Sequence, residues 1–217
     1  MATTTTFQKQ GLVNGIGNLF LQMMETEESS VNAPTYADEV FETASIDTAQ
    51  ITVELNEKEI HLSDLLHSDL TNVTAVNVPI TAGYFPSGFA EEAQGMLEDG
   101  LGGWFLPTNP KKKPFRMAFP AKDENDDEII YSFPKCTLSP VDGNFQTRSN
   151  DTTEQIPTFN VKAVPMVYKT AGEPRRVYNK QSLRSPEEIA MWNREKLLTQ
   201  GWYNEATKEL CKITPTP

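Results

Sequence analysis

Several groups of residues carry side chains that are used in catalysis or metal binding, but their spacing does not fit such chemistry. The acidic turn Asp123–Glu128 offers carboxylate oxygens, the ligands that calcium prefers. An EF-hand loop beginning at Asp123 would need glycine at its sixth position and glutamate at its twelfth, where the chain has Glu128 and Pro134. We interpret the turn as a solvated hairpin tip, with a weak adventitious cation site as the alternative.

The remaining reactive residue types also lack a matching motif. His61 and His67 do not have the i, i+4 spacing of a zinc-binding helix. Gly15–Gly17 is not preceded by a strand, as a phosphate-binding loop would be. The acidic pairs Glu27–Glu28 and Glu91–Glu92 could serve a hydrolase, but chance adjacency explains them better in a chain with 30 acidic residues. The sequence therefore predicts no catalytic residue, no metal site and no cofactor.

Composition narrows the class of partner. The 217 residues include 19 Lys and Arg against 30 Asp and Glu, a net charge of -11, which argues against a surface built to grip nucleic acid. Cys136 and Cys211 lie far apart and are expected to be free thiols in a reducing compartment. The apolar stretch Leu12–Met24 is too short to span a bilayer and does not resemble a signal peptide. We expect synthesis in the cytoplasm and no membrane contact.

The centre of the chain has the pattern of an antiparallel sheet. Two strands are predicted at Phe115–Ala121 and Ile129–Leu138, on either side of the acidic turn. A third is predicted within Pro157–Ala163, where Phe159, Val161 and Ala163 alternate with polar residues. One face of this sheet is expected to lie in a core, and the other is expected to remain available.

Weaker patterns surround this centre. Ile51–Leu55 is expected to be a half-buried strand, and the leucines after it recur at helical spacing and predict a short helix over residues 62–70. The glycines at 100–103 predict a turn into a strand at Trp104–Phe105. Ser185–Glu188 has the form of a capping box with proline at the first helical position, which predicts a helix that ends near Gly201. A second short helix is expected over residues 204–212.

These patterns predict a mainly β fold divided into three parts. Residues 1–30 are expected to form an N-terminal arm, residues 31–168 an antiparallel β-sandwich or barrel with a short flanking helix, and residues 169–217 a linker with a C-terminal helical extension.

The order of the elements resembles a known family. From residue 11 to residue 167 the chain is similar to the major tail tube proteins of long-tailed bacteriophages that infect Gram-positive bacteria. The features that carry the resemblance are, in chain order, Tyr36–Val40, the strand Ile51–Leu55, the leucine-rich helix ending near His67, the hairpin at Asp123–Glu128, and the polar loop Arg148–Asp151 before the strand Ile156–Val164.

The resemblance implies a structural virion protein of the phage tail. It implies a homo-oligomer of stacked hexameric rings that form the tail tube through which genomic DNA is ejected, with transient, non-specific passage of double-stranded DNA. The partners implied are other tail proteins, namely the tape measure, terminator and distal tail proteins. Sheet edges paired between subunits would satisfy backbone groups that otherwise promote aggregation.

We expect one polar loop to act in ring or inter-ring assembly. Its residues are Thr147, Arg148, Ser149, Asn150, Asp151, Thr152, Thr153 and Glu154. An idle surface loop is the alternative for this segment. For the whole chain the alternatives are another ring-forming tail component, such as a terminator or baseplate protein, a hydrolase that uses the acidic pairs, and a monomeric β-sandwich that recognises carbohydrate or protein through Trp104, Phe105 and Tyr84.

Overall fold

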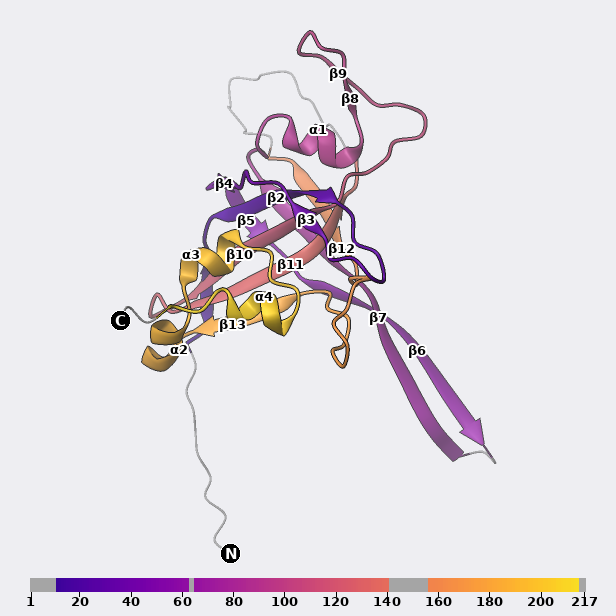
Figure 1. Ribbon diagram of the computed structural model, residues 1–217, viewed down its shortest axis with the longest axis vertical. Coiled ribbons are helices and arrows are strands. Elements are labelled where there is room, and N and C mark those ends of the chain that lie inside the picture. Colours follow the sequence, from indigo (N-terminus) through magenta and orange to yellow (C-terminus); the bar gives the residue numbers. More distant parts are fainter. Residues whose placement is uncertain (1–10, 63–64, 141–155, 215–217) are drawn as a thin grey trace, which may run out of the picture.

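A computed structural model describes residues 11–62, 65–140 and 156–214 of the chain. Its body is an antiparallel sheet of eleven strands in the order β3-β2-β10-β11-β12-β7-β5, to which β1, β4, β6 and β13 are attached (Figure 1). The predicted mainly β fold is confirmed. The strands are β1 (Val13–Ile16), β2 (Leu19–Thr26), β3 (Thr35–Tyr36), β4 (Phe41–Thr43), β5 (Ile46–Ala49), β6 (Thr52–Leu62), β7 (Leu65–Ala82), β10 (Phe115–Asp123), β11 (Glu128–Leu138), β12 (Thr158–Ala163) and β13 (Asn179–Leu183).

Short helices and a small second sheet complete the described part of the chain. The sheet is a two-stranded hairpin made of β8 (Leu97–Glu98) and β9 (Trp104–Phe105). The helices are α1 (Phe89–Gln94), α2 (Pro186–Met191), α3 (Arg194–Thr199) and α4 (Glu205–Glu209). The capping box predicted at the start of α2 is confirmed, because the Ser185 hydroxyl accepts from the Glu188 amide while the Glu188 carboxylate accepts from the Ser185 amide.

The hairpin β10–β11 forms where the sequence predicts it. The two strands pair from Phe115 to Lys122, and the acidic residues form the turn between them. Asp123 organises this turn: its Oδ1 accepts from the amides of Asn125 at 2.9 Å and Asp127 at 3.1 Å. The Asp123 side chain is buried, with Oδ2 3.3 Å from Nε of Arg184. The first carboxylate of the turn therefore holds the hairpin together and is not solvated, contrary to the sequence prediction.

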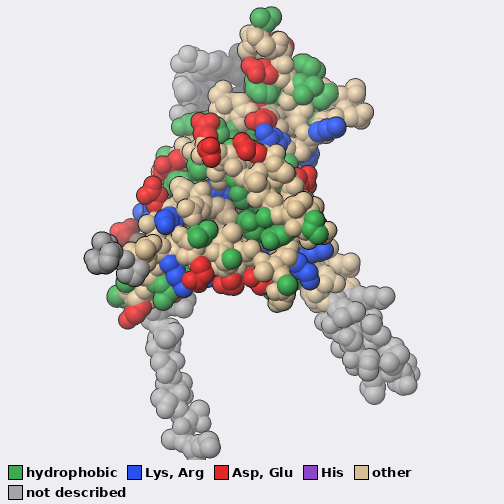
Figure 2. Space-filling view, in the orientation of Figure 1, with side chains coloured by type: hydrophobic (Ala, Val, Ile, Leu, Met, Phe, Trp, Pro, Cys, Tyr) green, Lys and Arg blue, Asp and Glu red, His purple; other side chains and the backbone are tan. Residues whose placement is uncertain are grey.

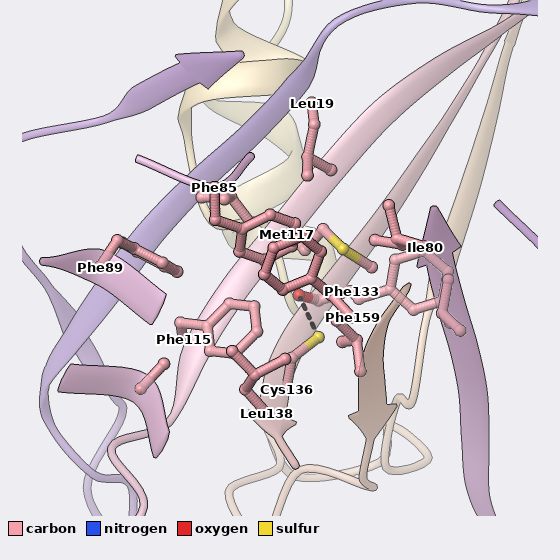
Figure 3. Close-up of a cluster of buried hydrophobic side chains, with 14 of the residues drawn as sticks. Leu19, Ile80, Phe85, Phe89, Phe115, Met117, Phe133, Cys136, Leu138 and Phe159 are labelled. Atoms are coloured by element: carbon pink, nitrogen blue, oxygen red, sulfur yellow. Dashed lines mark hydrogen bonds between the residues drawn. The ribbon is translucent and has the colours of Figure 1, made fainter. Parts of the chain in front are cut away.

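The main core lies inside the curved sheet. Apolar side chains from β2, β7, β10, β11 and β12 meet there, and α1 adds Phe89, Ala90 and Ala93 (Figure 3). The rings of Phe85 and Phe159 stack with centroids 3.9 Å apart, and Phe89 meets Phe115 edge to face at 5.3 Å. On β12 the predicted alternation is confirmed, since Phe159, Val161 and Ala163 are buried in this core.

A second core covers the opposite face of the sheet, which corrects the prediction that this face is free around β10 and β11. The segment α2–α4 packs onto β2, β10, β11 and β13, and Arg116 between them is fully buried. Strands with cover on both sides lose their alternating exposure, as seen along β10. The residues of this second core are Phe20, Ala118, Ile130, Leu183, Trp192, Leu197, Leu198, Trp202 and Cys211.

The helix predicted over residues 62–70 is wrong. The backbone there belongs to β6 and β7, which pair in antiparallel register from Thr52 opposite Asn77 to Leu62 opposite Leu65. An antiparallel ribbon and a short amphipathic helix compete for the same apolar residues, and spacing alone does not separate them over such a short run.

The predicted arm and the predicted linker both contribute strands. Within residues 11–30, β2 pairs with β10 and places Leu19 and Leu21 in the core without exposure. Within the C-terminal part, β13 pairs with β11 over Asn179–Leu183. The sheet therefore includes residues from all three predicted parts of the chain. The helices α2 to α4 follow β13, in the region where a helical extension was predicted. The helix predicted from Ser185 to near Gly201 is divided into α2 and α3 by a break at Trp192 and Asn193.

Candidate functional site

A two-stranded ribbon projects from the body of the molecule. It consists of β6 and the first part of β7, and Figure 1 shows it extending well beyond the sheet. β7 pairs with β12 over Val76–Thr81, whereas its residues 65–75 pair with β6 alone among the described strands. An isolated two-stranded hairpin is marginally stable in water, because neither face has a layer to bury it. Among the described strands, neither outer edge of the ribbon has a partner.

One face of the ribbon carries exposed apolar side chains. Val53 and Leu55 lie two residues apart on β6, and Val73 is paired directly with Leu55, so the three share a face. They are 41%, 50% and 42% exposed. Val53 is also paired with Val76, which is fully buried in the main core. The apolar stripe is thus the continuation of the core-facing side of the sheet, at the point where the core ends.

The other face of the ribbon is anchored by a polar network at its base. The carboxylate of Glu54 accepts from Nδ2 of Asn77 at 2.7 Å and from Nζ of Lys162 at 2.9 Å. The hydrogen bond from Lys162, and then the one from Asn77, lower the pKa of Glu54, so this carboxylate is charged at neutral pH. These contacts join β6, β7 and β12 and fix the direction in which the ribbon leaves the sheet.

The same side of the sheet continues as a polar surface, which we name the open face. Its side chains come from β5, β7 and β12, with Thr158 and Asn160 exposed and the Lys162 side chain 45% exposed. The ammonium group of Lys162 is paired with Glu54, so this charged pair is close to neutral. The open face consists of Thr48, Asn77, Pro79, Thr81, Thr158, Asn160 and Lys162.

A long edge of the sheet lies beside this surface. β5 and β6 follow each other along β7, β5 paired at Ile80–Ala82 and β6 paired up to Asn77. Among the described residues neither strand has a partner on its outer side. Such an edge presents unpaired amide and carbonyl groups that can template a further strand.

The assembly loop predicted from the sequence cannot be compared with this surface. Residues Thr147 to Glu154 lie outside the residues that the structure describes, so their role stays a prediction. Of the ribbon, only the part within Ile51–Leu55 was predicted as a strand, and residues 62–70 were predicted as a helix. The signal that was present is the run of β-branched residues on β7, including Thr71, Val73 and Thr74, which favours a strand.

The three aromatic residues proposed for carbohydrate recognition do not form one platform. Trp104 and Phe105 are adjacent on β9, so their side chains point to opposite faces of the small hairpin. Phe105 is paired with Leu97 and Trp104 with Glu98. Tyr84 is exposed in the segment between β7 and α1.

Other reactive groups are occupied in packing or ion pairs. Cys136 and Cys211 are free and buried, and burial raises the pKa of both thiols, that of Cys211 to about 11. Lys135 binds Glu27 at 2.6 Å and Glu28 at 3.0 Å. Burial acts to lower the pKa of Lys135, but the hydrogen bonds that its ammonium group donates to Glu27 and Glu28 outweigh it and raise the value.

Neither a metal centre nor a membrane span is found in the described part of the chain. Over residues 11–62, 65–140 and 156–214 there is no group of three or more His, Cys, Asp and Glu side chains arranged to hold a metal ion. The helices within those ranges are all too short, or not apolar enough, to cross a bilayer.

Comparisons with known proteins give no family assignment. No protein family model matches the chain, and no curated protein matches it. Among solved structures, the chain is similar to the anti-feeding prophage cap, described as a tube-terminating cap, with a TM-score of 0.47 and 11% identity over 84% of this chain and 99% of that chain. It is also similar to a chain of the anti-feeding prophage baseplate, with a TM-score of 0.37 and 9% identity over 85% of this chain and 100% of that chain.

Proposed function

We propose that this protein is a structural subunit of a phage-type tail, without enzymatic activity, and that copies of it assemble through the β6–β7 ribbon. The observation that carries the proposal is a ribbon with free backbone edges and an exposed apolar stripe at Val53, Leu55 and Val73. A neighbouring copy that covers the stripe and pairs with an edge would supply the missing layer. Contacts of this head-to-tail kind close into rings when the rotation between copies permits.

The finer proposal is a tube of stacked hexameric rings around a channel for double-stranded DNA, as the resemblance to major tail tube proteins implies. One feature that carried this resemblance, the helix ending near His67, is a strand, while the hairpin at Asp123–Glu128 and the strand after the polar loop are present. The open face suits a channel wall, because duplex DNA carries about one charge per 1.7 Å and a basic wall would hold it strongly. Lys162, the basic residue of that face, is neutralised by Glu54.

A second candidate is another ring-forming tail component, such as a terminator or baseplate protein. The C-terminal segment favours this possibility, because α2 to α4 cover one face of the sheet and make it unavailable for contacts between copies. A component of this kind would form single rings without stacking into tubes, so the shape of the assembly separates the two candidates.

The experiment compares Leu55→Asp and Val73→Asp with Val31→Asp, which changes an equally apolar residue that is 78% exposed outside the ribbon. Each protein is followed by sedimentation velocity and negative-stain electron microscopy over a series of concentrations. We expect wild-type protein and Val31→Asp to form rings or tubes, and the ribbon variants to remain monomeric at concentrations at least tenfold higher. Thermal unfolding of the monomers should differ little, because the stripe lies outside the core.

Two results would overturn the proposal. One is a wild-type protein that stays monomeric at every concentration, both alone and with other tail proteins. The other is assembly of Leu55→Asp and Val73→Asp at the same concentration as Val31→Asp.

A further inference from the structure

A second exposed apolar feature lies at the opposite end of the molecule from the ribbon. The segment 96–113 leaves the body between α1 and β10 and folds into the β8–β9 hairpin (Figure 1). Figure 2 shows hydrophobic side chains at this end of the molecule, with acidic and basic side chains close by. At the tip of the hairpin, Leu101 is 93% exposed. Leu97 and Phe105, which are paired across the same hairpin, are 51% and 52% exposed, and exposed apolar side chains gathered on one element indicate an interaction site.

The tip is fixed by its own backbone. Oδ1 of Asp99 accepts from the amides of Leu101 and Gly103, both at 2.8 Å. Gly100 and Gly102 have φ values of 76° and 87°, in the left-handed region where glycine is favoured. The backbone hydrogen bonds lower the pKa of Asp99, first the one from Leu101 and then the one from Gly103, so the tip carries a negative charge at neutral pH. Leu101 is therefore presented by a preorganised acidic turn, which reduces the entropy lost on binding.

A cavity of about 350 Å³ lies at the base of the same segment. At its edge the chain at Lys111 passes close to the C-terminal end of α1, where a Cβ on Gly95 would lie 2.6 Å from the carbonyl oxygen of Lys111. Its size is at the lower end of the range of about 300–1,000 Å³ that is typical of binding pockets. Its walls combine apolar side chains with lysine stems and are formed by Glu92, Gly95, Met96, Leu97, Pro107, Asn109, Lys111 and Lys113.

The charges at the tip and at the cavity are opposite. Glu98 and Asp99 precede the exposed leucine, and both are exposed. At the cavity Lys113 is paired with Glu92 at 2.6 Å, whereas exposed Lys111 has no ion-pair partner among the residues that the structure describes. We name the tip of the hairpin, Glu98–Gly103, the knob. An acidic, apolar knob and a basic, partly apolar cavity thus lie on the same segment of the chain.

We propose that the acidic tip of one copy inserts Leu101 into this cavity on a second copy, with Glu98 and Asp99 facing Lys111 of that copy. The contact is heterologous, because knob and cavity are different surfaces, and a pair of copies keeps one free cavity on the first copy and one free knob on the second. Repetition therefore builds a closed ring or an open chain, not an isolated pair. This contact rests on the proposed function in that it requires a second copy, but it uses the end of the molecule opposite the ribbon.

Cross-linking of mixed single-cysteine variants tests the contact. Leu101→Cys and Asn109→Cys are made in separate chains of different tag length and mixed under mild oxidation; the native thiols are buried and do not interfere. We expect a mixed disulfide dimer at least fivefold more abundant than either homodimer. The control mixes Val31→Cys with Asn109→Cys. A mixed dimer no more abundant than in this control would overturn the proposal.

Charge reversal supplies an independent readout. Glu98→Lys on the Leu101→Cys chain, or Lys111→Glu on the Asn109→Cys chain, should each lower the yield of mixed dimer several-fold, and the two together should restore it. If the yield of mixed dimer is the same in the charge-reversed variants as in the parent pair, Lys111 is not the partner of Glu98 and Asp99.

The outcomes separate this contact from the ribbon. If mixed dimers form while Leu55→Asp and Val73→Asp assemble normally, the ribbon proposal fails and the knob contact stands. If rings form and depend on the ribbon but no mixed dimer appears, the ribbon proposal stands and the knob contact fails.

Discussion

Arg116 is the residue whose environment differs most from what its type suggests. It is fully buried between the sheet and the C-terminal helices, and burial lowers its pKa to about 10. Its Nε donates to Oε1 of Gln22, and its Nη1 donates to the carbonyl oxygen of Leu198 at 3.0 Å. Leu198 lies in the last turn of α3, where carbonyl groups lack helical partners and a positive charge is favourable. Arg116 therefore fastens α3 to β10.

Two substitutions of Arg116 should distinguish how much its hydrogen bonds stabilise the protein from how much the burial of its charge destabilises it. We expect Arg116→Ala to lower the free energy of unfolding by about 3 kcal/mol, since it leaves a cavity and two acceptors without a donor. Arg116→Met keeps most of the volume and removes the desolvated charge, so it should cost less, about 1–2 kcal/mol. Urea denaturation followed by tryptophan fluorescence measures both. Exposed Arg175→Ala serves as the control; equal effects of Arg116→Ala and Arg175→Ala would contradict the assignment.

The burial of Arg116 could not be predicted from the sequence. A charged residue in an alternating strand indicates a solvated face, and Arg116 stands between Phe115 and Met117 in that pattern. The prediction failed because the cover comes from residues 186–210, far along the chain. Phe159, Val161 and Ala163 were predicted correctly, because only one side of β12 faces a core.

At the scale of elements, Trp202 is a second residue that attaches the C-terminal helices to the sheet. Its side chain is 1% exposed, its Nε1 donates to the carbonyl oxygen of Leu197 at 3.1 Å, and its own carbonyl oxygen accepts from Nδ2 of Asn179 at 2.9 Å. Trp202 thus contacts α3 through its indole and β13 through its backbone carbonyl, within the second core. The helices are too short to be stable without such packing.

We expect Trp202→Ala to destabilise the protein by about 3–5 kcal/mol, the range for removal of a buried tryptophan. Trp104→Ala is the matched control, since Trp104 is only half-buried on the β8–β9 hairpin and should cost about 1 kcal/mol or less. Differential scanning calorimetry distinguishes the two. A Trp202→Ala protein that unfolds at the wild-type temperature would show that the helices do not contribute to the stability of the sheet.

Elements were predictable where a local sequence signal specifies them, even along β10, where both faces are buried. The β10–β11 hairpin and the start of α2 follow from alternation and from the capping box. β13 was missed because Asn179 and Gln181 point into a buried polar contact and remove the apolar alternation. Within the ribbon, Ile51–Leu55 was predicted as a strand from its alternation, whereas residues 62–70 were predicted as a helix, because their leucines also recur at helical spacing.

The molecule as a whole combines strong negative charge with a nearly neutral open face. The net charge of -11 keeps copies apart, and screening limits this repulsion to about 8 Å at physiological salt. The two contacts proposed between copies, the apolar stripe of the ribbon and the knob with its cavity, are local and can form despite this repulsion. Along the open face, threonine, asparagine and one neutralised lysine offer little that would retain a phosphate backbone.

If the open face lines a channel, basic residues placed there should convert the assembly into a DNA-binding protein. We expect the variant Thr158→Lys with Asn160→Lys to retain duplex DNA in filter-binding assays at low salt, with affinity falling steeply as salt rises, because each ring repeats both charges and each neutralised phosphate adds to the salt dependence. Wild-type assemblies should retain little DNA at about 0.15 M salt. Asn32→Lys with Thr35→Lys adds the same charge at exposed positions elsewhere and should bind much more weakly. Equal DNA binding by the two lysine variants would place the open face outside any channel.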